Sequence, residues 1–461
     1  MSKFFGEKVF LENKVAIKLY DYAKELPIFD YHCHLSPKDI FEDKVFYNLS
    51  QLWLEGDHYK WRVMRTYGCD EELITGKASP KDKFFAFAKA LPSFIGNPVY
   101  HWAHLELCKY FGITLPICSK NAEEIWNTTE KMMASGDFSA KKLIEKSKVL
   151  GVVTTDDPID DLSFHYRLSK ENNPFKVFPC FRADRLLNAE KEEFLSYIQT
   201  LGKVAGVEIQ SYAQLEEAVK LRLDYFQKAG ATAMDVSFAD FPKEGEEIDW
   251  IAKVVRGEKL SRKEIEGYKF SLLTFLGTEL QKRNMVMQLH VGVIRNDNGK
   301  LFSKLGADCG GDSVANPVDI GGAVCLLDKI NTETNLPKTI IYTLNPTAYY
   351  PLSTLLGAFQ GGERGKLQLG AAWWFADHRD GIKEQMRHLA SQGGLGLFNG
   401  MLTDSRSFTS YARHDYFRKI LCSLIGEWVE NGEYPEDEET LEKLIKDICF
   451  DNAVNYFGVK L

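Results

Sequence analysis

The chain has 461 residues, of which 44% are hydrophobic and 26% are charged, a composition typical of globular proteins. Its formal net charge of -8 at pH 7 gives no basic surface of the kind that nucleic acids require, so we expect no nucleic-acid partner. The nine cysteines include no C-x-x-C pair, and no apolar run is long enough to cross a bilayer. Without an apolar leader near the N-terminus, the sequence predicts a cytoplasmic protein that does not associate with a membrane.

Short apolar runs, each followed by polar residues, recur along the chain. In chain order they cover residues 27–31, 152–154, 177–181, 231–234, 286–289, 339–344, 367–370 and 400–403. These eight runs predict strands, and most of them are separated by segments with the 3.6-residue periodicity of helices. Regular alternation of strand and helix is typical of an α/β protein with a (β/α)8 TIM-like barrel, whose chemistry lies at the carboxyl ends of the strands.

Two connections are too long for a simple strand–helix unit. We therefore predict an N-terminal helix and first barrel strand in residues 1–35, a large helical insertion over the active-site mouth in 36–150, and the rest of the barrel in 151–461. A second excursion covers residues 241–281, and residues 414–457 are predicted to form closing helices.

The first run leads into a histidine pair. His32 and His34 are two residues apart, so at the end of a strand they point to the same side and can bind one divalent ion. The alternative is a chance H-x-H on a surface strand, or a pair of core histidines. The apolar residues before the pair and the Ser36-Pro37 turn after it favour the metal site.

Asp404, at the end of the last run, is the natural third ligand, because strands 1 and 8 are neighbours in a closed barrel. A carboxylate there can bind the ion or act as a general base beside it. An N-cap of the following segment is an equally good interpretation of Asp404 from the sequence alone.

Three arginines, Arg182, Arg295 and Arg406, follow predicted strand ends and are expected to face the same mouth. Guanidinium groups bind carboxylate or phosphate in a bidentate manner, so this pattern indicates a small anionic substrate. The alternative, a structural ion pair, applies to most arginines taken singly and is weaker for three at matching positions.

Aromatic residues provide further candidates. His58 and Tyr59, inside the insertion, could cover the mouth, although packing of Tyr59 with Trp53 and Trp61 is the better interpretation from sequence alone. Trp373, next to Trp374, could form a flat wall for a sugar ring, or could simply fill space.

Nucleotide-binding motifs are missing. The Gly394-Leu395-Gly396 segment precedes a predicted strand instead of following one, and residues 361–366 have no Ser or Thr after the lysine that a P-loop needs. We therefore expect no nucleotide cofactor.

Several segments together resemble the uronate isomerase (glucuronate isomerase) family, an outlying branch of the amidohydrolase superfamily. They are Phe29-Asp30-Tyr31-His32-Cys33-His34-Leu35, residues 57–62 (DHYKWR), 288–292 (QLHVG), 295–296, 373–375 (WWF) and 400–408 (GMLTDSRSF). The resemblance runs from the N-terminus to about Phe457. It implies a distorted barrel and an enzyme that converts D-glucuronate to D-fructuronate and D-galacturonate to D-tagaturonate through a cis-enediol.

The resemblance also implies roles for individual residues. A single divalent metal, most simply zinc, would be bound by His32, His34 and Asp404. The substrate pocket would include His58, Tyr59, Arg182, Asp235, His290, Arg295, Trp373 and Arg406, with Asp240 and Trp374 as close rivals of Asp235 and Trp373. Our hypothesis for the chemistry is that His32 and Asp404 assist ring opening and that Tyr59, as a phenolate, moves the proton between C2 and C1. A homo-oligomer is expected.

Two other functions are compatible with the same residues. The first is a mononuclear metal-dependent hydrolase on the same barrel; a two-metal centre is disfavoured because Asp235 stands near the place of the bridging lysine. The second is a sugar-acid-binding protein without catalytic activity, which would not need the histidine pair and Asp404.

Overall fold

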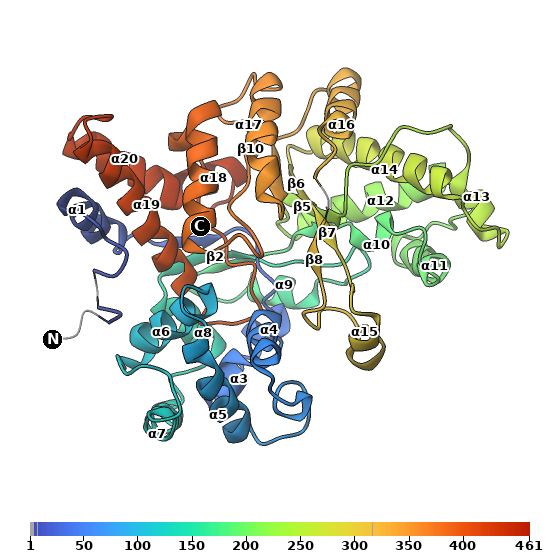
Figure 1. Cartoon of the computed structure of the whole chain (residues 1–461). Coiled ribbons are helices and arrows are strands. Elements are labelled where there is room, and N and C mark those ends of the chain that lie inside the picture. The colour runs from blue at the N-terminus through green and yellow to red at the C-terminus, as the bar shows by residue number, and fades with distance from the viewer. Residues whose placement is uncertain (1–3, 7, 316) are drawn as a thin grey trace.

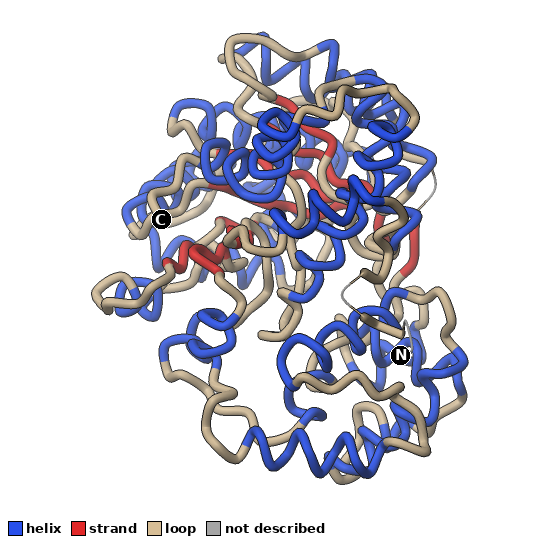
Figure 2. The backbone as a smooth tube through the Cα atoms, turned by 90° about the vertical axis from the view of Figure 1, so that its left-hand side faces the viewer, coloured by secondary structure: helices blue, strands red, loops and turns tan. Residues whose placement is uncertain are grey.

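Parallel strands occupy the interior of the protein and helices surround them (Figures 1 and 2). The structure, a computed structural model, describes residues 4–6, 8–315 and 317–461. One parallel sheet has the order β1-β2-β3 and the other has the order β10-β9-β6-β5-β4. The strands are β1 Ile28–Asp30, β2 Val149–Val153, β3 Lys176–Phe178, β4 Phe181–Arg182, β5 Ala233–Phe238, β6 Val286–Val291, β9 Thr339–Thr343 and β10 Leu367–Leu369. The predicted α/β class with a parallel sheet is confirmed.

The two sheets are linked where one predicted strand is interrupted. The run at residues 177–181 forms the end of β3 and the start of β4, with Pro179 between them. Proline has no N–H group to donate to a neighbouring strand, which explains the break. Asp156 continues the pairing across it, because its N–H donates to Cys180 (3.0 Å) and its carbonyl accepts from Arg182 (2.9 Å). The eight strands of the two parallel sheets therefore follow one another in chain order.

The prediction of an eighth strand at residues 400–403 is wrong, because this segment is irregular in the structure. Gly400 has φ +72° and Asp404 has φ +44°, so the backbone at both ends of this segment is in the left-handed region instead of the extended one. A Cβ atom on Gly400 would lie 2.1 Å from the carbonyl oxygen of Ile448, so only glycine can occupy this position without a shift.

This irregular segment nevertheless lies beside the end of β1. The N–H of Asp404 donates to the carbonyl of His32 (3.2 Å), and the N–H of His34 donates to the carbonyl of Ser405 (3.0 Å). The buried carboxylate of Asp30 accepts from the N–H and the hydroxyl of Thr403, at 2.8 and 2.6 Å. Side-chain hydrogen bonds thus replace part of the regular strand ladder at this point.

Between β1 and β2 the chain forms a group of helices, which lies in the lower part of Figure 1. They are α2 Pro37–Phe41, α3 Leu49–Trp53, α4 His58–Tyr67, α5 Pro80–Ala90, α6 Pro98–Phe111, α7 Ala122–Met133 and α8 Ala140–Lys146, with short 3-10 turns at Glu71–Leu73 and Leu91–Ser93. The start of α4 is set by Asp57, whose carboxylate accepts from the N–H groups of Tyr59 and Lys60. This cap fixes where His58 and Tyr59 begin the helix.

Helices α9 to α18 connect the later strands. They are α9 Ser163–Leu168, α10 Asp184–Leu187, α11 Phe194–Ala205, α12 Tyr212–Lys228, α13 Trp250–Val255, α14 Arg262–Lys282, α15 Gly299–Leu305, α16 Ile320–Glu333, α17 Tyr349–Ala358 and α18 Arg379–Gln392. The predicted excursion at residues 241–281 contains α13 and most of α14. Between β6 and β9 an antiparallel hairpin, β7 Val293–Ile294 and β8 Ser313–Val314, carries α15 in its loop.

The C-terminal helices close the structure, as predicted. They are α19 Ala412–Glu430, α20 Glu438–Lys446 and α21 Asn452–Phe457, with a π-helical turn at Asp447–Asp451. Helix α19 packs against α1 (Lys14–Ala23), and its Arg418 donates to the carbonyl of Leu26 at 2.9 Å, just before β1. In the part of the chain that the structure describes, no helix is both long enough and apolar enough to cross a membrane.

Candidate active site

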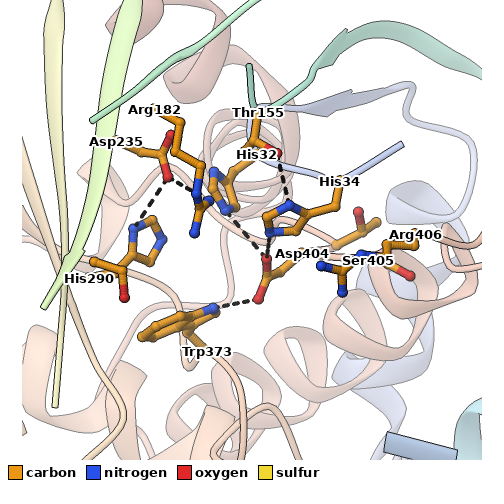
Figure 3. Close-up of polar contacts among 12 residues, drawn as sticks. His32, His34, Thr155, Arg182, Asp235, His290, Trp373, Asp404, Ser405 and Arg406 are labelled. Atoms are coloured by element: carbon orange, nitrogen blue, oxygen red, sulfur yellow. Dashed lines mark hydrogen bonds and ion pairs between the residues drawn. The ribbon is translucent and has the colours of Figure 1, made fainter. Parts of the chain in front are cut away.

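A cavity of about 640 Å³ opens where several parallel strands end. Nine of the residues predicted for the site line it: His32, His34, His58, Arg182, His290, Arg295, Trp373, Asp404 and Arg406. Tyr59 and Asp235 do not line it, and lie behind the wall. The cavity thus brings together residues from both sheets and, through His58, from the insertion. Figure 3 shows the polar contacts among the residues at the strand ends.

The three predicted metal ligands converge on one point. Nε2 of His32 and Nε2 of His34 lie 3.3 and 3.0 Å from Oδ1 of Asp404. One ligand atom from each of the three residues lies within 4.8 Å of the other two. On the opposite side of the carboxylate, Nε1 of Trp373 donates to Oδ2 at 2.5 Å. Two imidazoles and a carboxylate are a donor set that suits zinc and related divalent ions.

Thr155 orients His34, and sequence reasoning missed it. Its Oγ1 lies 2.8 Å from Nδ1 of His34. When Nδ1 of His34 is protonated, it donates a hydrogen bond to Oγ1 of Thr155. Nε2 then has its lone pair directed towards Asp404, where a cation would bind. A signal for Thr155 was present, because it directly follows the apolar run at residues 152–154.

Burial and the close pairing set the charges of these three side chains. Burial opposes ionisation of Asp404, but contacts with His32 and His34 hold the pKa of its carboxyl well below the usual range. Burial lowers the pKa of His34 to about 4, so this imidazole is neutral at pH 7. Burial also lowers the pKa of His32, but the carboxylates of Asp404 and Asp235 outweigh it and the net shift is upward. The cluster therefore holds a carboxylate and at least one neutral imidazole.

Asp235 supports the site from inside the sheet. Strand β5 extends further than the predicted run, so Asp235 lies within the strand and is fully buried. Its Oδ2 accepts from Nη1 of Arg182 at 2.8 Å and lies 4.0 Å from Nδ1 of His290. Asp240, the alternative candidate, lines a separate, larger cavity, and its carboxylate accepts a hydrogen bond from the backbone N–H of Asp319. Of the two rivals, Asp235 is therefore the one in contact with the site.

His290 presents a neutral ring to the cavity. It stacks on Tyr342 with ring centroids 4.5 Å apart, and burial lowers its pKa well below the usual value. Among the described residues, neither of its ring nitrogens has a hydrogen-bond partner. A buried imidazole without partners is costly, so this ring is suited to a hydrogen bond with a bound molecule.

The remaining two predicted arginines form a cationic pair at another part of the cavity. Arg406 and Arg295 both lie near Asp308, at 2.8 and 3.8 Å, and Arg295 also contacts Asp312 at 3.2 Å. The guanidinium of Arg295 lies 5.1 Å from the ring of Trp374, which also lines the cavity. Sequence reasoning missed Asp308, since it lies in a loop far from any predicted strand.

His58 and Tyr59 stack on each other but face different surroundings. His58 lines the cavity, packs edge-on against Trp374, and has a buried Nδ1 without a partner among the described residues. Tyr59 packs against Trp102, and its hydroxyl donates to Oδ2 of Asp377 at 2.9 Å. Burial and the Asp377 carboxylate raise the pKa of Tyr59 well above its ordinary value. Tyr59 is therefore a neutral phenol in this arrangement.

Comparison with known proteins decides the family. A sequence model described as glucuronate isomerase matches residues 1–457. The chain belongs to the glucuronate isomerase family. A uronate isomerase from Caldanaerobacter subterraneus subsp. tengcongensis is 48% identical, over 100% of both chains. The predicted family and the predicted function, uronate isomerase, are confirmed.

Solved structures of uronate isomerases are also similar. The uronate isomerase from Thermotoga maritima is 33% identical, with a TM-score of 0.93 over 99% of this chain and 100% of that one. A glucuronate isomerase from Caulobacter crescentus, at 23% identity, shares the fold with a TM-score of 0.90 over 99% of this chain and 97% of that one.

Proposed function

We propose that this uronate isomerase interconverts D-glucuronate with D-fructuronate and D-galacturonate with D-tagaturonate. The observation that carries the proposal is the convergence of His32, His34 and Asp404 in one cavity that is also lined by four arginines, among them the three predicted ones. An aldose–ketose isomerisation moves a proton between C2 and C1 and needs no redox nucleotide. The cavity therefore has to bind an anionic sugar, open its ring and transfer one proton.

We propose that the two histidines and Asp404 bind a single divalent ion, zinc. The fit rests on the donor set, on the 3.0 and 3.3 Å approach of both Nε2 atoms to Oδ1 of Asp404, and on the Thr155 contact that orients His34. A zinc ion there would stabilise negative charge on a substrate oxygen.

Ring opening is assigned to Asp404, with His32 beside it. Opening a cyclic uronate requires a base to take the proton of the anomeric hydroxyl and an acid to protonate the ring oxygen. The depressed pKa of Asp404 keeps its carboxyl ionised as the proton acceptor, and the same carboxyl can then return the proton to the ring oxygen. His32 assists as the neighbour whose Nε2 lies 3.3 Å from Oδ1 of Asp404. Trp373 donates to Oδ2 and so fixes the orientation of the carboxylate.

Transfer of the proton from C2 to C1 is assigned to Tyr59. In a cis-enediol both carbons present the same face, so one group can remove the proton and return it. The hydroxyl of Tyr59 now donates to Asp377, so for this role it has to turn towards the cavity and lose its proton, because a neutral phenol cannot remove the proton from C2. His58, its neighbour on α4, already lines the cavity and is the second candidate for the base.

The arginines are assigned to two different negative groups of the substrate. Arg182 lies beside Asp235 and His290 near the metal ligands, where a guanidinium would stabilise the enediolate oxygen. Arg295 and Arg406 lie together on the hairpin side of the cavity and are assigned to the carboxylate of the substrate. This division leaves the sugar carbons between the two cationic regions.

We also propose that the strands form a distorted (β/α)8 barrel. The bonds between residues 404–405 and residues 32–34 support closure of the sheet beside β1. The three-part division of the chain, a homo-oligomeric assembly and a cytoplasmic location stay predictions from the sequence.

The decisive experiment follows both uronates by NMR in D2O with the purified protein, with and without a chelator. We expect a ketose of unchanged mass in H2O, one deuterium at C1 in D2O, and loss of activity with the chelator. A product heavier by one water, or no conversion of either uronate, would contradict the proposed reaction.

The role of Tyr59 has its own test. The Tyr59→Phe variant should lose exchange of the C2 proton with solvent while it still binds the sugar, because only the hydroxyl is removed. Exchange at the wild-type rate would exclude Tyr59 and leave His58 as the base, which a His58→Asn variant would then test.

A further inference from the structure

Asp308, a residue of the chain itself, forms ion pairs with Arg406 and Arg295 in the cavity. Oδ2 of Asp308 lies 2.8 Å from Nη2 of Arg406, and Oδ1 lies 3.8 Å from Nη1 of Arg295. All three residues line the cavity that contains the metal ligands. Burial opposes ionisation of Asp308, but the two guanidinium groups hold the pKa of its carboxyl below the usual value. The pair that we assign to the substrate carboxylate is therefore already neutralised in part.

Contacts other than these ion pairs also hold the loop that carries Asp308. It lies in the loop between α15 and β8, and this loop is docked on α4 of the insertion. Nη1 of Arg62 donates to the carbonyl of Gly310 at 3.0 Å, and Nη1 of Arg65 donates to the carbonyl of Cys309 at 2.5 Å. Both contacts fix the backbone that follows Asp308. The carboxylate of Asp308 therefore faces the arginines from a fixed segment of backbone.

Asp308 is also more exposed than the other carboxylates that pair with Arg182, Arg295 or Arg406. Its side chain is 51% exposed, whereas Asp312 is 3% exposed and Asp235 is fully buried. Asp312 also accepts from the N–H of Asn296 at 2.7 Å, so it is part of the hairpin structure. An incoming anion can replace a solvent-exposed partner at small cost, but not a buried one.

We propose that Asp308 limits the affinity for uronates by competing with the substrate carboxylate for Arg295 and Arg406. The inference rests on the proposed function, which assigns this arginine pair to the uronate carboxylate. A sugar with a carboxylate restores the ion pairs that it breaks when it displaces Asp308. A neutral sugar has no carboxylate that could displace Asp308, so its binding should not depend on this competition.

The Asp308→Asn variant tests the proposal. It removes the competing charge and keeps the size of the side chain. We expect the KM for D-glucuronate and the inhibition constant of D-gluconate, an anionic probe, to fall about two- to fivefold, as for a partly exposed ion pair. The inhibition constant of xylitol, a neutral probe, should not change, and kcat should stay within about twofold, since Asp308 touches no reacting atom in this proposal.

Asp297→Asn is the matched control. Asp297 is an exposed carboxylate of the same hairpin, accepts from the hydroxyl of Ser313, and does not line the cavity. This variant loses the same charge and should leave all three constants unchanged. An equal effect of Asp297→Asn would show a general change in charge and overturn the proposal. A higher KM in Asp308→Asn, or an equal shift for xylitol, would overturn it as well.

Binding measurements separate this inference from the proposed function. Calorimetric titration of D-gluconate needs no turnover, so it reports on Asp308 even if the wild-type protein converts neither uronate. Tighter binding of D-gluconate by Asp308→Asn, with unchanged thermal unfolding, supports the inference. Binding that is unchanged or weaker refutes it, whatever the outcome of the isomerase assay.

Discussion

Replacement of Thr155 by valine tests the metal centre without removing a ligand. Oγ1 of Thr155 lies 2.8 Å from Nδ1 of His34, whose Nε2 lies 3.0 Å from Oδ1 of Asp404. Valine has nearly the same shape as threonine but cannot accept a hydrogen bond. In Thr155→Val the imidazole of His34 therefore keeps its surroundings and loses the contact that selects its tautomer and orientation.

The expected size of the effect follows from the geometry. The His34 side chain is only 21% exposed, so water replaces the missing contact poorly. Loss of the partner that orients a ligating histidine weakens metal binding about 10- to 100-fold. That range corresponds to about 1.4–2.7 kcal/mol of binding free energy.

The assay is a zinc titration of metal-free protein in competition with a chromophoric chelator. Thr155→Ser is the matched control, because serine keeps the hydroxyl and should bind zinc close to the wild-type affinity. The reasoning is refuted if Thr155→Val binds zinc within about twofold of the wild type, well inside the expected range. It is also refuted if Thr155→Ser is as weak as Thr155→Val.

Three further predictions concern charge, backbone and the carboxylate ligand. Burial raises the pKa of Asp156 to about 7. The folded protein therefore holds this proton more tightly than the unfolded chain, whose aspartate pKa is about 3.9, and the free energy of unfolding should fall as pH rises from about 4 to 7. Urea denaturation should show that Asp156→Asn gains stability relative to wild type between pH 5 and pH 8, and an equal difference at both pH values would contradict this. Gly400→Ala should lower the free energy of unfolding by about 2–4 kcal/mol, from backbone strain and the clash with a carbonyl. Gly362→Ala, with φ +78° but open space around it, should cost only about 1 kcal/mol; similar losses in both variants would disprove the clash. Asp404→Asn removes the charged ligand, so elemental analysis should find less bound metal and the isomerase assay no turnover; full metal content with full activity would remove Asp404 from the centre.

Much of the site could be predicted because its residues carry local signals. The H-x-H spacing predicted a shared target for His32 and His34, and the end of an apolar run marked Asp404 as their partner. The three atoms meet as expected. Chain-order pairing also followed from the alternation of apolar runs and helical segments, since the strands formed by the first seven predicted runs pair in the order of those runs.

The failed eighth strand shows the limit of such signals. Residues 400–403 have the apolar character of a strand, yet their backbone groups bond to side chains from β1 and the residue after it. The hydroxyl of Tyr31 donates to the carbonyl of Gly400 at 2.7 Å, and Asp30 accepts from Thr403. These partners are more than 360 residues away in the chain, and no local pattern in the segment predicts them.

The sequence by itself determined which residue types stand at the strand ends, and therefore the chemistry that the protein can perform. Hydrophobic periodicity acts between neighbours in the chain, so it is visible in the sequence. Only the tertiary structure decided which partner each functional group has: Thr155 for His34, Asp377 for Tyr59, and Asp308 for Arg406. Each of these contacts joins segments about a hundred or more residues apart, and packing of the whole chain selects one partner among many similar side chains.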